Sequence, residues 1–92
     1  MKLIPFEDKL IVRKVPTIDV RQQFPQLIFP NPNLDGLMVV TVETPPKDME
    51  TIHRGDVLVV TTAGYYPFEF GKLELMCIFV DDIIFQIEED DD

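Results

Sequence analysis

The fold is decided by a ten-residue stretch, HRGDVLVVTT, at residues 53–62. Its Arg-Gly-Asp is typical of a tight turn, because glycine and aspartate adopt turn conformations at little cost. The β-branched run that follows predicts a strand over residues 57–62, which Ala63-Gly64 ends. Repeated turn-and-strand units of this length are typical of small all-β domains.

The same unit recurs on both sides of this stretch. Further strands are predicted at residues 9–15, 37–43, 65–70, 73–80 and 83–87. The aromatic strand at 65–70 is expected to be short or to form an irregular edge. Turns separate the strands about every 8 to 12 residues, and no segment has a helical period. The sequence therefore predicts one all-β domain over residues 1–92, a small barrel or sandwich.

Residues 16–35, PTIDVRQQFPQLIFPNPNLD, interrupt this pattern with four prolines and with no period of either strand or helix. We therefore predict a long loop in place of a packed element. Three large apolar residues, Leu27, Ile28 and Phe29, lie between prolines within it and are too apolar for an idle linker. We expect a surface other than this chain's own core to bury them.

The charge balance excludes one class of partner. The chain has 17 acidic and 8 basic residues, and nucleic acids are bound largely through lysine and arginine, so no nucleic-acid partner is expected. Hydrophobic residues make up 46%, which predicts that copies of this short chain share apolar surface. A single cysteine, with no signal-peptide run and no stretch of about 20 apolar residues, predicts a cytoplasmic protein without a membrane span.

Residues suited to catalysis or metal binding are few. His53 is the only histidine and lies in a predicted turn, while Cys77 lies among apolar strand residues. Nothing in their spacing supports a Cys–His nucleophilic pair, and one histidine with one cysteine is too few for a metal site. Residues 88–92 are expected to form a solvated acidic tail that attracts divalent cations only weakly. We predict no enzyme activity, no metal site and no cofactor.

The aromatic group at residues 65–70 leaves two interpretations open. Tyr65, Tyr66, Phe68 and Phe70 could stack nucleotide bases, as the aromatic faces of some small barrels do. Base binding also needs a basic groove beside the rings, which this acidic chain does not offer. The sequence favours an aromatic cluster that closes one end of the barrel.

Taken in order, these segments resemble the GroES-type co-chaperonins (the chaperonin-10 family) from about residue 2 to residue 88. The opening PFEDKLIVR at 5–13 is similar to that family's signature of proline, an apolar residue, any residue, aspartate and a basic residue before an apolar run. As in the family, a loop with an apolar tripeptide follows. The later resemblances are GLMVV at 36–40, RGDVLV at 54–59, GY at 64–65, DII at 82–84 and IE at 87–88. Order and spacing carry the resemblance, because a Gly-Asp turn alone occurs in many barrels.

The resemblance implies a small irregular β-barrel with a mobile loop at about 16–35, assembled as a seven-membered ring. The ring would cap a GroEL-type chaperonin, with Leu27, Ile28 and Phe29 in a groove of its apical domain, and enclose an unfolded client protein for ATP-dependent folding. In that family the first strand of one subunit pairs with the last strand of its neighbour. That pairing implies an interface formed by Lys2, Leu3, Ile4, Ile83, Ile84, Phe85 and Ile87.

Two departures make the chain more similar to the bacteriophage-encoded members of this family, which work in the host cytoplasm. Phe24-Pro25-Gln26 stands where paired glycines usually precede the tripeptide, and the turn at about 44–54 is shorter than the usual roof hairpin. Prolines restrict a loop to extended conformations, so we expect them to lower the cost of ordering it. Tyr65 and Tyr66 are candidates to face the enclosed chamber.

A second class of function stays open. The chain could be a monomeric acidic β-barrel that docks its Leu27-Ile28-Phe29 loop into a partner's pocket as an inhibitor or interaction protein. The size of the free protein separates this alternative from a ring.

Overall fold

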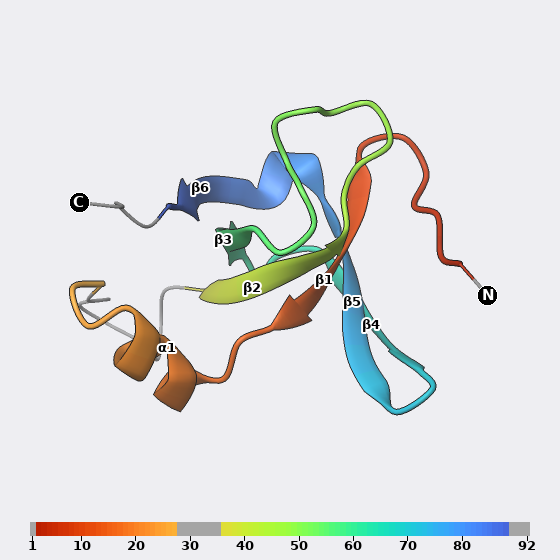
Figure 1. The fold of residues 1–92 in the computed structure, drawn as a ribbon. Coiled ribbons are helices and arrows are strands. Elements are labelled where there is room, and N and C mark those ends of the chain that lie inside the picture. Colours follow the sequence, from red (N-terminus) through yellow and green to blue (C-terminus); the bar gives the residue numbers. More distant parts are fainter. Residues whose placement is uncertain (1, 28–35, 89–92) are drawn as a thin grey trace.

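The computed structural model describes residues 2–27 and 36–88, and six of the eight elements in these residues are strands (Figure 1). The elements in chain order are β1 (Lys9–Lys14), α1 (Thr17–Gln23), β2 (Leu37–Thr44), β3 (Val57–Thr61), β4 (Tyr65–Phe70), β5 (Leu73–Phe79), the 3-10 helix η1 (Val80–Asp82) and β6 (Ile83–Ile87). The strands of the described residues form one antiparallel sheet in the order β4-β5-β1-β2-β3-β6. The predicted all-β class is therefore confirmed.

The short link between β5 and β6 shows that the sheet curls into a barrel-like shape. These two strands lie four places apart in the sheet order, which in a flat sheet corresponds to about 19 Å. The three residues of η1 join them directly and rise only about 6 Å. The link is possible only because the sheet curls, and a backbone hydrogen bond of 2.7 Å from the Val80 N–H to the Asp8 carbonyl holds η1 beside the start of β1.

The inside of the curl holds the main core, which we call the inner cluster. Successive strand residues point to opposite faces of a sheet, so alternate residues of four strands share this side. Its buried members are Leu10, Val12, Met38, Val40, Val42, Ile52, Leu58, Val60, Met76 and Ile78. All except Ile52 come from β1, β2, β3 and β5. Ile52 belongs to the connection at 45–56, which contains no strand. It is the residue of this connection that packs in the inner cluster.

A second, smaller core lies on the opposite face of β2 and β3, and we call it the outer cluster. Val39 and Val59 form its floor, and Val20 of α1 is buried against them. Its partly buried members are Val15, Phe24, Leu27, Leu37, Val57 and Ile87. The middle of β2 and β3 is therefore buried on both faces, which explains why MVV and LVV read as continuous apolar runs.

The predicted loop over residues 16–35 was wrong at its beginning, because residues 17–23 form helix α1. Pro16 precedes the helix with φ −58°, a value that its ring fixes. The helix ends before Phe24 because the residue preceding a proline, here Pro25, is disfavoured in the helical conformation. Val20, Phe24 and Leu27 follow one another at helical spacing and all pack on the outer cluster. Within the described residues, no helix is both long and apolar enough to cross a bilayer.

Candidate partner-binding sites

Within the described residues, one end of the sheet is an unpaired strand edge that carries exposed apolar residues. β6 pairs with β3 on one side and is the last strand of the sheet order on the other. Ile84 and Phe85 are 53% and 42% exposed, whereas Ile83 packs against the inner cluster and Ile87 against the outer cluster. Of the residues predicted for an interface on this strand, Ile84 and Phe85 are thus the ones available to a partner. An exposed apolar edge of this kind is a template for strand pairing.

The N-terminal segment is the other part of the predicted interface. Residues 2–6 form no strand, and Ile4 and Phe6 are 65% and 78% exposed. Lys2 is exposed, Leu3 is partly buried, and Pro5 is the buried residue of the segment. The segment and β6 lie on opposite sides of the molecule (Figure 1), so the two parts of the predicted interface do not meet within one chain.

The opposite end of the sheet, β4, is less suited to strand pairing. Pro67 lies in the middle of β4 and has no N–H to donate to a further strand. Tyr65 and Tyr66 are both exposed, and the Tyr66 ring meets the Phe79 ring edge-on at 6.4 Å between centroids. The Lys9 ammonium lies 5.1 Å from the centre of the same Phe79 ring. These contacts hold the Tyr66 ring against the sheet and leave much of it in solvent.

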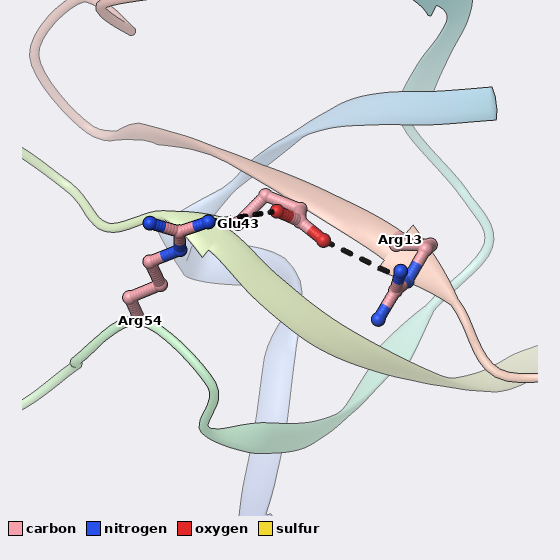
Figure 2. A network of polar contacts seen from close by, with 3 residues as sticks. All are labelled: Arg13, Glu43 and Arg54. Carbon is pink, nitrogen blue, oxygen red and sulfur yellow. Dashed lines mark ion pairs between the residues drawn. The ribbon is translucent and has the colours of Figure 1, made fainter. Parts of the chain in front are cut away.

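An ionic network lies on the outer face of β1 and β2, where Figure 2 shows Glu43 between Arg13 and Arg54. The Glu43 side chain is 20% exposed, and each of its carboxylate oxygens faces one guanidinium group, Arg13 Nε at 3.6 Å and Arg54 Nη2 at 4.0 Å. Arg54 belongs to the turn before β3, where Gly55 has φ +91°. The Gly55 N–H donates to the Val42 carbonyl at 2.9 Å. The network therefore ties β1, β2 and this turn together.

The predicted binding loop is only partly within the described residues. Leu27 is partly buried against the outer cluster of its own chain, and its burial by another molecule stays a prediction. Its backbone N–H donates to the Phe24 carbonyl at 3.0 Å, which turns the chain back over the sheet after α1. Ile28 and Phe29 lie outside the described residues.

A cleft of about 910 Å³ opens where β1 and β5 diverge. The β1–β5 ladder ends at the pair Val12–Met76, although β5 extends back to Leu73. The charged residues lining the cleft are Arg13, Lys14, Lys72, Asp19, Glu69 and Glu74. Three basic and three acidic side chains balance one another there, so the cleft offers no concentrated charge to an ionic ligand.

The two residues considered for chemistry have separate surroundings. The His53 N–H donates to Asp56 Oδ2 at 2.8 Å, which closes the turn before β3. Cys77 pairs with Ile11 and Tyr66 in the sheet, and its partial burial raises the pKa of the thiol, an effect that nearby Lys9 opposes. A raised pKa disfavours the reactive thiolate. Within residues 2–27 and 36–88, no three histidine, cysteine or acidic side chains are grouped to hold a metal ion.

Comparison with known proteins gives no relative: no family model matches the chain, and no curated protein matches it. The co-chaperonin resemblance therefore depends on the sequence motifs alone.

Sequence reasoning missed the outer cluster and the ionic network. A signal for the first exists, because Val20, Phe24 and Leu27 have the 4-and-3 spacing of one helix face. The prolines that flank this segment obscured it. The network has no such signal, because Glu43 lies 30 residues from Arg13 in sequence and meets it only through the pairing of β1 with β2.

Proposed function

We propose that this chain is a co-chaperonin that assembles into a ring and caps a GroEL-type chaperonin through its apolar loop. The observation that carries the proposal is the placement of two apolar segments, the N-terminal residues and the β6 edge, on opposite sides of one subunit (Figure 1). Two different surfaces that complement each other head-to-tail generate a closed ring when the rotation closes. A ring of seven is what the family resemblance implies.

The surfaces of one subunit support this arrangement chemically. Ile4 and Phe6 on one side and Ile84 and Phe85 on the other are largely exposed, and pairing them in the ring removes them from water. The β6 edge supplies unpaired backbone groups for a strand from the neighbour, whereas Pro67 makes the β4 edge a poor competitor. Assembly through β6 also removes an aggregation hazard from the sheet.

The loop supplies the contact with the chaperonin. Fully burying a leucine, isoleucine or phenylalanine side chain yields about 1.5 to 3 kcal/mol, while ordering one residue of backbone costs about 1 to 2 kcal/mol. One loop therefore binds weakly, and linked copies in a ring bind tightly through their number.

Sedimentation of the free chain and of its mixture with a GroEL-type chaperonin and ATP tests the proposal. We expect a species of about seven subunits of 10.6 kDa each that co-sediments with the chaperonin. Ile28→Asp should leave the ring intact and abolish co-sedimentation, because a charge cannot enter an apolar groove without a large desolvation cost. Thr51→Asp, which adds the same charge on the exposed connection between β2 and β3, is the matched control and should bind normally.

Deleting residues 1–6 tests the interface separately. We expect monomers, because the deletion removes the segment that pairs with β6 of the neighbour. A ring that survives the deletion contradicts this interface. A wild-type monomer that binds a partner through its loop would instead support the alternative of an acidic interaction protein.

A further inference from the structure

The first residue of the apolar tripeptide already has a binding place in its own chain. Leu27 packs against the cluster formed by Val20, Val39 and Val59. Two backbone hydrogen bonds fix the approach, from the Phe24 N–H to the Val20 carbonyl at 2.8 Å and from the Leu27 N–H to the Phe24 carbonyl at 3.0 Å. We call this unit, residues 17–27, the clasp.

A leucine side chain cannot lie in two apolar sites at once. We propose that the clasp is an autoinhibitory contact, in which the outer cluster holds Leu27 in competition with the partner's groove. The inference rests on the proposed function, because it regulates the same tripeptide. Capping then requires Leu27 to leave Val39 and Val59, so only molecules with an open clasp present all three residues to the partner.

The clasp is built to open at low cost. α1 has seven residues and no side-chain hydrogen bond at its N-cap, and among its residues 18–23 Val20 is the buried one. Ile18 and Arg21 on the same helix are exposed, and Phe24 and Leu27 are only partly buried. A helix this short depends on its packing for stability, so local opening requires little more than the loss of these few contacts. The sheet beneath keeps its inner cluster when the clasp opens.

Competition of this kind sets the affinity of each loop. When a protein binds only from its open state, the apparent affinity is reduced by the fraction that is open. Weakening the clasp raises that fraction and therefore tightens binding, even though the substitution lies on the sheet and touches no partner. Simple loss of stability predicts the opposite, because a partly unfolded subunit binds less.

Two adjacent valines of β3 provide a matched test. Val59 and Val60 are both completely buried, but Val59 faces the outer cluster under the clasp and Val60 faces the inner cluster. Val59→Ala removes two methyl groups from the surface on which the clasp packs. Val60→Ala makes the same chemical change on the other side of the strand. The measurements are the binding of each intact variant to a GroEL-type chaperonin and hydrogen exchange of the Leu27 amide in the free protein.

We expect Val59→Ala to bind about three- to tenfold more tightly than the wild type, and its Leu27 amide to exchange faster. Val60→Ala should bind no more tightly than the wild type. Its Leu27 amide should exchange faster only as far as the loss of global stability in this variant explains. If all three proteins bind and Val59→Ala gains nothing over Val60→Ala, the proposed function stands and the autoinhibitory clasp is wrong. If none of the three binds the chaperonin, the proposed function itself fails, and the competition with it.

Discussion

Val59 and Val60 are neighbours in β3 and are equally buried, yet they belong to two cores of different construction. The inner cluster is assembled almost wholly from strands, whose ladders fix every side chain from both sides. The outer cluster has a floor of two strand residues and a cover supplied by a seven-residue helix and the turn after it. The inner core defines the fold, and the outer core couples the fold to the loop that is proposed to bind a partner.

The largest loss of stability is expected when a side chain of the inner cluster is shortened. Leu10 is completely buried in β1 between two neighbouring strands, so Leu10→Ala leaves a cavity that the ladders prevent from collapsing. We expect the free energy of unfolding to fall by about 2 to 5 kcal/mol, measured by urea denaturation. Ile18→Ala on the exposed surface of α1 is the control and should change it little. A loss below about 1 kcal/mol for Leu10→Ala would mean that the inner cluster is not the main core.

A smaller effect is expected from the cover of the outer cluster. Val20→Ala removes the buried side chain of α1, and the short helix can move away from the sheet instead of leaving a cavity. We expect a loss of about 1 kcal/mol in urea denaturation. Hydrogen exchange should accelerate in residues 20–27 and stay slow in β1, β2 and β3. Uniform acceleration throughout the sheet would show that the inner and outer clusters unfold as one unit.

The smallest effect is expected on the part of the outer face that α1 does not cover. Glu43→Gln removes the charge that faces Arg13 and Arg54, and both guanidinium groups remain accessible to water. Ion pairs of this exposure contribute little, so the free energy of unfolding should fall by less than about 1 kcal/mol. The difference from wild type should shrink in high salt, because ions screen the pair. A larger loss that is insensitive to salt would show that Glu43 acts through packing or hydrogen bonding.

Much of the fold could be predicted because its strands have recognisable local sequence patterns. The β-branched runs of β1, β2, β3 and β6, the apolar run of β5 and the glycine turns appear in the sequence close to where the structure has these elements. α1 could not be recognised by the same rules, because the prolines at 16 and 25 leave it only seven residues in which to show a period. Its stability comes from Val39 and Val59, which are distant in sequence and face outward only once β2 and β3 have paired.

The candidate site residues also differ in how much of their surroundings the sequence could predict. Ile4, Ile84 and Phe85 are exposed, and their part in an interface between copies stays a prediction. The sequence alone placed Leu27 in a binding tip, whereas the structure places it against the sheet. Which surface buries a leucine depends on the register of distant strands, and local patterns do not contain that information.

Electron microscopy of the wild-type protein mixed with a GroEL-type chaperonin and ATP tests the proposed function most directly. We predict chaperonin particles with a ring-shaped cap on at least one end, and bare ends when Ile28→Asp replaces the wild type. Bare ends with the wild-type protein, at concentrations where it forms a ring by itself, would contradict the account.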